Sequence, residues 1–539
     1  MTILSLLNFV GIWIPAVVSA LYVGLMKQLN PEYIVTMNTY ISGLRIGFFV
    51  MILNLLVNVA TFSNGKRKYG PFDALEFERD PYSHPAKKLS ATYPVIPEEM
   101  ATKQPEGIVI GKRGKKYVCN KLAESGAHHT IILGESGCGK TSTVVLDSLL
   151  CNAEAGVFAI DVKGELHEKG AYLGDADVMI VDPADRTTYG YDLFYSLREN
   201  PSEQEILDTL RDTVLSLIPL RADEKNPFWP RSARTLLLAL LLYCYHRGIK
   251  NMIDIVDEIT KDSIRGIVEQ VFNEAPEEST EHKLISTFYS LPDETLGSVN
   301  GQMQQALELL ITDENIRFML RDNHKIMKPS DLNRRKKIYL SIREDKLLAY
   351  AQLLHLIVNQ TLTEMEKRHE GNTPVLVIID ELPRILSVGK IAKLENALET
   401  LRSRNVTLML IAQSLEALER AYTKKDVDAM VANCPYKIIL SATSVSTQDT
   451  IRKWAGKYKE YKYTRNGTGS KRSTSVTMED KDIVEGADLL TLPRAKEAVI
   501  ITPYGYNRVK KVSYYKDKKI APIAREIKKQ NEIYKKIQQ

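Results

Sequence analysis

The sequence has little cysteine and almost no excess of charge of either sign. Its five cysteines are scattered without a C-x-x-C pair, which argues against a disulfide framework or a zinc site and for reduced thiols in a cytosolic setting. The formal net charge of +5 over 539 residues is typical of neither a nucleic-acid coat protein nor an acidic-tailed protein. No internal repeat or coiled-coil heptad is evident, so solenoid and coiled-coil architectures find no support. The remaining composition, 44% hydrophobic and 26% charged, is that of an ordinary globular protein, and the length leaves room for about three domains.

Two long apolar runs lie near the N-terminus. Residues 3–26 carry no charge and are long enough to span a hydrocarbon core of ~30 Å, and residues 46–62 form a second run. A secretory signal peptide is the alternative for the first run. However, no positively charged region precedes it, and a second run follows soon after. We therefore expect two transmembrane helices.

The charges that flank these runs predict their orientation. Residues 66–68 read Lys-Arg-Lys just beyond the second run, whereas the short loop between the runs carries only Lys27, Glu32 and Arg45. Positively charged flanks stay on the cytoplasmic side of a membrane. The large C-terminal part is therefore expected in the cytoplasm, where ATP is available.

A complete phosphate loop, G-x-x-x-x-G-K-[ST], occupies residues 134–141. A short apolar strand at 130–133 precedes it and a helix at 142–150 follows, which is the order that the motif requires. The glycines let backbone N–H groups converge on the phosphates of a nucleotide at the positive end of the helix, and a glycine-rich turn without a ligand is the alternative. Lys140 is expected to reach the β- and γ-phosphates, and the Thr141 hydroxyl to complete a Mg²⁺ site. The expected ATP-binding residues are Gly134, Glu135, Ser136, Gly137, Cys138, Gly139, Lys140 and Thr141.

Further apolar runs alternate with helical stretches and predict an α/β domain with a parallel sheet. From about 196 to 330, helical periodicity dominates without convincing strands. This stretch holds 15 Lys and Arg against 22 Asp and Glu, a net charge of −7. Because an acidic surface repels phosphates, we do not expect this insert as a whole to grip DNA directly. The expected strands lie at 157–161, 178–181, 337–341, 375–380, 406–412, 436–440 and 498–502.

The expected organisation is a nucleotide-binding domain interrupted by an all-α insert. A basic stretch at 464–475 is expected to be a flexible loop, either merely solvated or in contact with a nucleic-acid backbone. The basic amphipathic tail could dock on its own domain, on a membrane surface or on a partner. The expected segments are a membrane anchor at 1–68, the first part of the nucleotide-binding domain at 69–195 after a linker, the all-α insert at 196–330, the second part of the nucleotide-binding domain at 331–515 and the tail at 516–539.

An apolar strand at 375–379 ends in two carboxylates, Asp380 and Glu381. Together with a phosphate loop, this pair is typical of an ATPase: Asp380 would hold Mg²⁺, and Glu381 would polarise the attacking water. Gln413, at the end of the next strand, would sense the γ-phosphate or position water, with a strand-end hydrogen bond as the alternative. Arg402 or Arg404 could reach the nucleotide of a neighbouring subunit as an arginine finger, although a solvated arginine is equally consistent with the spacing.

These blocks, in this order, resemble the TraG/TraD family of type IV secretion coupling proteins, the membrane-anchored ATPases of bacterial conjugation. The resemblance implies a RecA-like phosphate-loop NTPase domain with an all-α insert, a homo-hexameric ring and a two-pass location in the bacterial inner membrane. Arg402 lies eleven positions before Gln413 and looks like the family's proposed trans-acting arginine. Val162 replaces a proline that is common in the family, which puts only the local turn in question. The resemblance rests on the two apolar runs, the phosphate loop, Asp161-Val162-Lys163-Gly164-Glu165, Asn226-Pro227-Phe228-Trp229, Asp380-Glu381-Leu382-Pro383, Ile411-Ala412-Gln413-Ser414, Asn433-Cys434 and residues 489–493.

The resemblance implies a coupling protein that receives a relaxase–DNA complex (the relaxosome). It would use ATP hydrolysis to feed single-stranded DNA toward a type IV secretion channel. A coupling ATPase that recruits protein effectors only is an alternative that the sequence barely separates from this function. An FtsK-type chromosome translocase is less favoured, because no C-terminal winged-helix module is evident. A transporter-type ATPase would need a Leu-Ser-Gly-Gly-Gln signature, which is absent.

Overall fold

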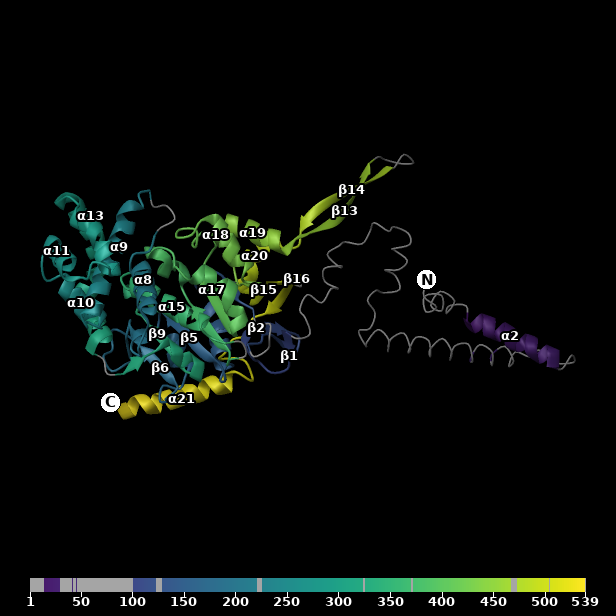
Figure 1. Cartoon of the computed structure of the whole chain (residues 1–539). Coiled ribbons are helices and arrows are strands. Elements are labelled where there is room, and N and C mark those ends of the chain that lie inside the picture. The colour runs from purple at the N-terminus through teal and green to yellow at the C-terminus, as the bar shows by residue number, and fades with distance from the viewer. Residues whose placement is uncertain are drawn as a thin grey trace. The chain divides into compact units, whose positions relative to one another are not determined.

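The computed structural model describes residues 14–29, 41, 45, 100–122, 128–220, 225–322, 325–369, 372–466, 473–503 and 505–538. The chain divides into two compact units (Figure 1). The smaller unit comprises residues 1–94 and 457–483. The larger unit comprises residues 95–456 and 484–539 and contains the phosphate loop.

The larger unit is built on one twelve-stranded sheet with the strand order β1-β3-β2-β16-β15-β12-β4-β11-β10-β5-β9-β6. The seven strands from β12 to β6 pair in parallel, and the other five form an antiparallel extension beyond β12, so the expected α/β fold is confirmed. The parallel strands are β4 (Thr130–Leu133), β5 (Gly156–Asp161), β6 (Val178–Val181), β9 (Lys337–Ser341), β10 (Val375–Ile379), β11 (Val406–Ala412) and β12 (Tyr436–Ile439). The antiparallel strands are β1 (Ala101–Thr102), β2 (Ile108–Arg113), β3 (Lys116–Asn120), β15 (Glu497–Thr502) and β16 (Gly505–Lys510).

Four central strands of this sheet, β4, β5, β10 and β11, are buried along their whole length. Strands that are covered on both faces need no polar alternation, which is why they read as continuous apolar runs in the sequence. Their register aligns their carboxyl ends, because Ile379 pairs with both Ile160 and Leu410, and Ala412 pairs with Leu133. The residues that follow these strands therefore meet at one edge of the sheet.

The remaining helical segments of the larger unit, apart from the insert, follow or precede these strands. They include η2 (Thr141–Val145), α6 (Leu146–Leu150), α7 (Glu165–Gly170), α15 (Ala351–Glu366), α16 (Leu382–Ile385), α17 (Leu394–Thr400), η8 (Leu401–Arg404), α18 (Lys424–Ala432), α19 (Val445–Ala455), α20 (Gly486–Ala495) and α21 (Ala521–Gln538). Helices that link parallel strands cover the faces of the sheet, which accounts for the burial of its central strands.

The stretch expected to be an all-α insert is mainly helical. Ser202, Asn251, Ser263 and Ser279 begin four of its helices, because each side chain accepts a hydrogen bond from a backbone N–H of the first turn. Figure 1 shows α9, α10, α11 and α13 gathered at one end of the larger unit. One short strand, β8 (Ile326–Met327), lies where no strand was expected, and it pairs with β7 (Gly190–Tyr191). The insert helices are α8 (Glu203–Leu217), α9 (Phe228–His246), α10 (Met252–Ile259), α11 (Ile264–Glu274), α12 (Thr280–Tyr289), α13 (Asp293–Thr312) and α14 (Glu314–Arg317).

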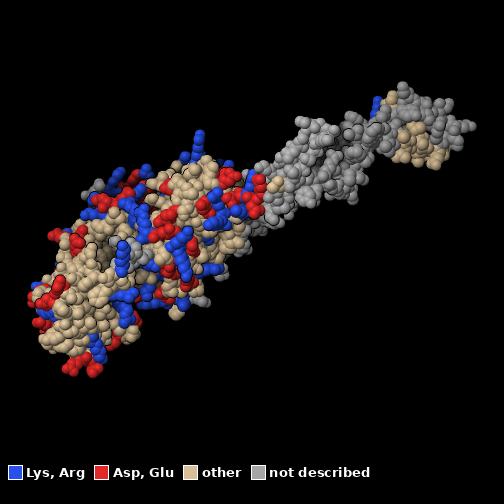
Figure 2. All heavy atoms as spheres, turned by 90° about the horizontal axis from the view of Figure 1, so that it is seen from above, with Lys and Arg blue, Asp and Glu red and all other residues tan. Residues whose placement is uncertain are grey.

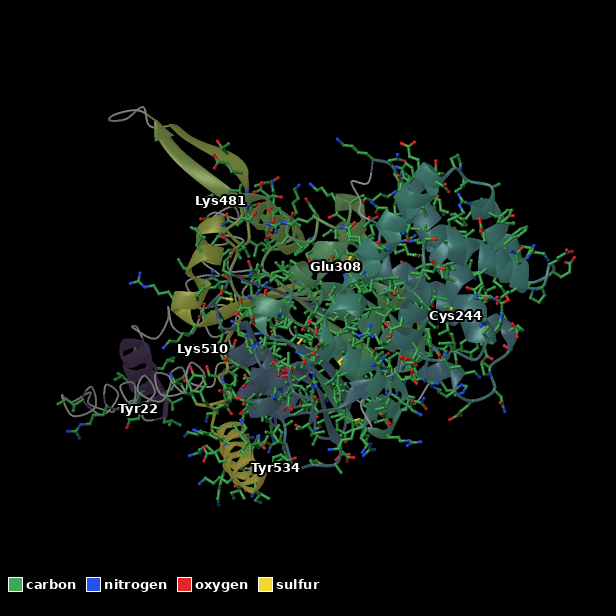
Figure 3. All side chains as sticks on the ribbon, turned by 90° about the vertical axis from the view of Figure 1, so that its left-hand side faces the viewer. Tyr22, Cys244, Glu308, Lys481, Lys510 and Tyr534 are labelled. Carbon is green, nitrogen blue, oxygen red and sulfur yellow. The ribbon has the colours of Figure 1, made fainter. Side chains whose placement is uncertain are left out.

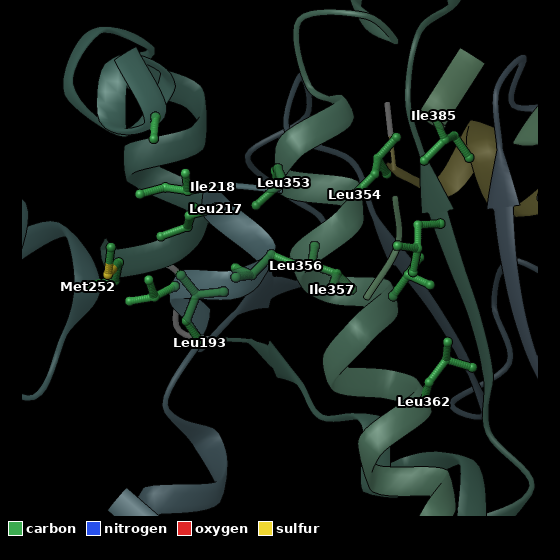
Figure 4. Close-up of a cluster of buried hydrophobic side chains, with 14 of the residues drawn as sticks. Leu193, Leu217, Ile218, Met252, Leu353, Leu354, Leu356, Ile357, Leu362 and Ile385 are labelled. Atoms are coloured by element: carbon green, nitrogen blue, oxygen red, sulfur yellow. The ribbon is translucent and has the colours of Figure 1, made fainter. Parts of the chain in front are cut away.

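The insert helices and the sheet share one continuous apolar core. Figure 4 shows Leu217 and Ile218, at the C-terminal end of α8, beside Leu353 and Leu356 of α15. All four side chains are buried. Burying apolar surface stabilises a fold by about 25 cal/mol per Å², so this contact holds the insert firmly against the sheet. The expected limits of the insert at 196 and 330 do not coincide with a break in the core.

The C-terminal tail folds back onto its own domain, where α21 packs against α7. Figure 1 shows α21 lying along one side of the larger unit. Ile520 and Ile527 are buried in one cluster with Tyr117 of β3 and Leu150 of α6. The sequence left open whether this basic helix docks on its own domain, on a membrane surface or on a partner. The structure shows it docked on its own domain.

The basic stretch at 464–475 belongs to the smaller unit, and its two described ends, 464–466 and 473–475, are strand. β13 (Lys457–Asn466) and β14 (Ser473–Asp482) form an antiparallel hairpin in which Thr464 pairs with Ser475. The expectation of a flexible loop was therefore wrong for both flanks of this stretch, because their backbone groups pair with one another. Residues 467–472 lie outside the described part of the chain.

The expected membrane spans lie in the N-terminal part of the smaller unit. α2 (Ile14–Leu29) covers the described part of the first apolar run, and residues 46–62 lie outside the described residues. Within the residues that the structure describes, no helix is both long and apolar enough to cross a membrane. The two-pass anchor stays a prediction.

Candidate nucleotide-binding site

The phosphate loop connects the buried strand β4 to η2, a π-helical turn that continues into α6. Its path depends on glycine, since Gly137 and Gly139 have φ angles of +77° and +96°, a region that residues with a Cβ rarely adopt. At Gly134 the reason is space, because a Cβ there would lie 2.6 Å from Cys138 Sγ. The loop is thus built between a strand and a helix, as the motif requires.

Lys140 folds back over the beginning of the loop and is buried. Its Nζ donates hydrogen bonds to Gly134 O at 2.7 Å and to Glu135 O at 3.3 Å. An ammonium group has three N–H donors, so one remains for an incoming anion. The two carbonyls hold the charge in place before any ligand binds.

Several backbone amides of the loop are available to an anion. In the described part of the chain, the N–H groups of Gly137, Gly139 and Lys140 make no hydrogen bond to another residue. They lie at the start of the helical segment, where the aligned peptide dipoles favour negative charge. The residues present therefore fit the phosphates of a nucleotide.

Thr141 and Thr143 lie in the first turn after the loop, with different hydrogen bonds. The N–H and Oγ1 of Thr143 both donate to Gly139 O, at 2.9 and 2.7 Å, and so close the turn. The hydroxyl of Thr141 makes no hydrogen bond to any residue that the structure describes. It stays available as a metal ligand.

Asp380 and Glu381 follow the end of β10. Glu381 has a φ of +50°, which turns the chain sharply into α16, and its N–H donates to Asp380 Oδ1 at 2.9 Å. Burial and the neighbouring Glu381 raise the pKa of Asp380 to about 6, while the charge of Lys140 acts in the opposite direction. The structure therefore brings the carboxylate pair and Lys140, which are far apart in sequence, to the same edge of the sheet.

The predicted metal ligands come from two different elements. Across the described residues, no group of three or more His, Cys, Asp or Glu side chains could hold a metal ion by itself. Mg²⁺ usually takes one or two protein ligands and completes its octahedron with phosphates and waters. Thr141 after the loop and Asp380 at the end of β10 fit that pattern.

Asp161 belongs to a block on which the family resemblance rests, but the sequence analysis assigned it no role in the site. It ends β5 beside Asp380, since Ile160 pairs with Ile379. Its Oδ2 accepts hydrogen bonds from the N–H of His167 at 2.9 Å and from the His167 ring at 2.8 Å. The signal was present in the sequence, because a buried apolar strand ends here in a carboxylate, as it does before Asp380.

Gln413 follows β11 and lines a cavity of about 480 Å³ together with Glu381. Arg384 and Arg420 also line this cavity. A carboxylate and an amide that share one cavity can hold a water molecule between an acceptor and a donor. The arrangement is compatible with the expected role of Gln413 in positioning water.

Arg402 lies at the opposite edge of the sheet. It belongs to η8, which precedes β11, whereas Gln413 follows β11. The seven residues of β11 span about 20 Å at roughly 3.3 Å per residue. After burial, the charge of Arg402 is the main cause of the lowered pKa of His128 and His129, which precede β4. The structure thus does not bring Arg402 to the phosphate loop of its own chain.

Three residues far away in the sequence, Ser441, Thr443 and Lys511, form hydrogen bonds with the phosphate loop. The N–H of Glu135 donates to Ser441 Oγ at 2.8 Å, and Thr443 Oγ1 donates to Glu135 Oε1 at 2.5 Å. Lys511 Nζ donates to Cys138 O at 2.9 Å. These contacts join residues 306 to 373 positions apart, so no local motif could have predicted them.

The model of the family described as "Type IV secretory system Conjugative DNA transfer" matches residues 83–538. The chain belongs to this family. Protein VirD4 of Rhizobium radiobacter is 25% identical over 449 residues, which cover 77% of this chain and 61% of the relative. Conjugal transfer protein TraG of the same species is 22% identical over 505 residues, which cover 86% of this chain and 75% of the relative. The chain spans about three fifths of the length of its VirD4 relative.

Solved structures of conjugative coupling proteins share the fold of this family member. The unbound bacterial conjugative coupling protein TrwBdeltaN70 superposes with a TM-score of 0.60 at 17% identity, covering 77% of this chain and 90% of its own. Plasmid coupling protein TrwB in complex with the non-hydrolysable ATP analogue ADPNP gives a TM-score of 0.61 at 17% identity, covering 77% and 91%. This member of the conjugative DNA transfer family therefore has the RecA-like phosphate-loop NTPase fold of TrwB.

Proposed function

We propose that this protein is the ATPase of a type IV secretion system and couples ATP hydrolysis to the transfer of single-stranded DNA. One observation carries the proposal: Lys140 and the Asp380–Glu381 pair meet at one edge of the sheet, in a chain of the conjugative DNA transfer family. TrwB, which shares the fold, has been solved with an ATP analogue and with ADP and Mg²⁺. Those complexes support ATP and Mg²⁺ as ligands of this chain.

In the proposed reaction, Lys140 and the free amides of Gly137 and Gly139 hold the terminal phosphates. A bound Mg²⁺, held by Thr141 and Asp380, would neutralise charge on the phosphate oxygens. Glu381 accepts a proton from the attacking water, and Gln413 orients that water in the cavity that they share.

We propose that Arg402 acts across a subunit boundary in a homo-hexameric ring. The support is its exposure and its position at the edge of the sheet opposite its own phosphate loop. An arginine there can stabilise transition-state charge only on a nucleotide held by a neighbouring chain. Arg404, in the same turn, is the alternative.

The proposed substrate is a relaxase–DNA complex, and the proposed partners are the relaxosome, single-stranded DNA and the components of a type IV secretion channel. Figure 2 shows Lys and Arg interspersed with Asp and Glu over one face of the larger unit. Interspersed charge favours a local contact with the DNA backbone over a broad basic surface. The acidic insert at 196–330 would dock protein rather than DNA.

The proposed location is the bacterial inner membrane, with residues 3–26 and 46–62 as a two-pass anchor. The support is the absence of charge in the first run and the Lys-Arg-Lys sequence after the second. The two parts of the nucleotide-binding domain, at 69–195 and 331–515, would then lie in the cytoplasm.

The test is transfer of a conjugative element from donors that carry Lys140→Ala or Glu381→Gln. Lys367→Ala, at an exposed position outside the insert, is the control. We expect transfer to be lost in both site variants and retained in the control. Normal transfer from either site variant would refute the proposal that ATP hydrolysis by this protein drives DNA transfer. DNA-stimulated ATPase activity of the purified protein separates DNA transfer from a coupling ATPase for protein effectors, which needs no such stimulation.

A further inference from the structure

Residues 511–538, which we call the C-terminal strap, begin next to the phosphate loop. The strap begins after Lys510 at the end of β16 and ends with α21, which carries Tyr534 (Figure 3). Near the start of the strap, the N–H of Tyr514 donates to Ser142 O, one residue beyond the phosphate loop, at 3.4 Å. The strap therefore contacts the segment that would hold the nucleotide.

The far end of the strap is fixed to α7 by one buried amide. Asn531 Nδ2 donates to Glu168 O and to Ala171 O, both at 2.9 Å, and its Oδ1 accepts from the N–H of Leu173 at 2.9 Å. Asn531 is 5% exposed, so its own amide group is shielded from water. α7 in turn begins beside the carboxylate of Asp161. The strap is therefore attached both to the segment after the phosphate loop and to α7, which lies next to Asp161.

Lys511 is the one strap residue whose side chain reaches the loop, as far as the described residues show. Its Nζ donates to Cys138 O at 2.9 Å and lies 3.5 Å from Leu440 O. Its own N–H donates to Lys496 O at 2.9 Å, and the next residue, Val512, is buried. The backbone is thus fixed directly at the point from which the side chain extends.

The bond to Cys138 O has a consequence for the opposite side of the same peptide unit. Cys138 C=O and Gly139 N–H belong to one planar trans peptide, so the two groups point in opposite directions. A cation that holds the carbonyl on the outer side of the loop therefore directs the Gly139 N–H to the inner side. That amide is among those of the loop that have no partner within the described chain.

We infer that Lys511 is a positioning residue for nucleotide binding: it fixes and polarises the Cys138–Gly139 peptide so that the Gly139 amide faces the phosphates. The inference rests on the proposed function, because it assigns the loop to ATP. Hydrogen bonds to a charged group are about twice as strong as neutral ones, and the ammonium also adds positive charge beneath the anion site. Lys511 therefore acts through the loop and does not touch the nucleotide.

The test is the affinity of the full-length protein for a fluorescent ATP analogue with Mg²⁺, together with KM and kcat for ATP. Lys511→Met keeps the aliphatic stem and removes the charge and the donors, Lys511→Gln keeps a neutral donor, and Lys511→Arg keeps a charged one. Lys510→Met removes an exposed neighbouring charge, and Val512→Ala loosens the strap without removing the bond to the loop.

We expect Lys511→Met to raise Kd and KM roughly tenfold or more with kcat largely retained, Lys511→Gln to raise them less, and Lys511→Arg to restore most of the affinity. Lys510→Met and Val512→Ala should bind as the wild type does. Wild-type affinity in Lys511→Met would overturn the inference, as would an equal loss in either control. If Lys511→Met does not fold, Lys511→Gln and Lys511→Arg decide by the same criterion.

The two proposals fail in different ways. A wild-type protein that hydrolyses ATP, with Lys511→Met equal to it, leaves the ATPase intact and removes the role of Lys511. A wild-type protein that neither binds nor hydrolyses ATP, with Lys140→Ala indistinguishable from it, refutes the ATPase itself and the role of Lys511 with it.

Discussion

Asp161 and Asp380 leave adjacent parallel strands side by side, because Ile160 and Ile379 pair across β5 and β10. Their hydrogen bonds differ. Asp161 accepts from the backbone and the ring of His167, whereas Asp380 accepts from the amide of its neighbour Glu381. One carboxylate therefore holds α7 in place, and the second oxygen of the other would bind the metal ion of the proposed function. Two acids at the same edge of a sheet thus have separate tasks.

The first prediction concerns pH and Mg²⁺. Burial and Glu381 raise the pKa of Asp380 to about 6, so the carboxyl gains a proton as the pH falls through that value. Mg²⁺ needs the ionised carboxylate, and protons compete with it. We expect the Mg²⁺ concentration for half-maximal ATPase activity to rise as the pH falls from 7 to 5 and to change little from 7 to 8. The same Mg²⁺ requirement at pH 5 and pH 7 would contradict the role of Asp380.

The second prediction tests Arg402 by mixing variants. Lys140→Ala cannot use its own nucleotide but keeps Arg402, and Arg402→Ala keeps its loop but supplies no arginine to its neighbour. We expect each alone to lose about a thousandfold or more of kcat, and a mixture of the two to regain ATPase activity at the mixed interfaces. Arg404→Ala is the control and should stay active. A mixture as inactive as its components would argue against action in trans.

The third prediction concerns the attachment of α21 to α7. Asn531→Ala leaves the buried carbonyl of Ala171 and the partly buried carbonyl of Glu168 and amide of Leu173 without their partner. We expect it to lower the free energy of unfolding by about 2 kcal/mol, measured by urea denaturation. Gln530→Ala, at an exposed neighbouring position, should cost much less. Equal losses in the two variants would mean that the buried amide does not hold the helix.

The fourth prediction concerns Asp147 in α6, which is fully buried and whose carboxyl oxygens have no hydrogen-bond partner in the described chain. Burial is the main cause that raises its pKa to about 8; Asp517 adds to the rise and Lys112 opposes it. The unfolded chain releases this proton near pH 4, whereas the folded chain keeps it up to about pH 8. The folded state therefore binds more protons between these values, and the contribution of Asp147 to stability falls as the pH rises.

We accordingly expect Asp147→Asn to flatten the decline in melting temperature between pH 5 and 8, and to gain on the wild type at the upper end of that range. Asp428→Asn, at an exposed position, should leave the profile unchanged. A wild-type profile that Asp147→Asn does not alter would show that the carboxyl is hydrated or paired in solution.

The fold class, the phosphate loop and the carboxylate pair could be predicted from the sequence, because each depends on a local pattern of residues. Strands covered on both faces must be apolar throughout, so β5, β10 and β11 could be read directly from the sequence. The phosphate loop could be read because its φ angles demand glycine at fixed positions. Asp380 and Glu381 were found because polar residues at the end of such a strand stand out.

The hairpin of β13 and β14 was missed for the complementary reason. Its strands are rich in Lys, Tyr, Ser and Thr, and their apolar alternation is confined to Tyr461 and Tyr463 in β13 and to Val476 and Met478 in β14. Backbone pairing between two such strands depends on their register, which composition does not reveal. The docking of α21 was left open in the same way, because an amphipathic helix has an apolar face wherever it is bound.

The sequence by itself determined the chemistry of this protein: a glycine-rich loop with Lys140, a strand that ends in Asp380 and Glu381, and membership of the conjugative DNA transfer family. Each of these is a local pattern, set by backbone geometry or by burial. The tertiary structure alone decided which distant residues support that chemistry. Asp161 stands beside Asp380 because two strands share a register, Arg402 faces away because β11 separates it from Gln413, and Lys511 reaches Cys138 because the tail folds back. Long-range contacts of this kind depend on the packing of the whole domain, and no short stretch of sequence encodes them.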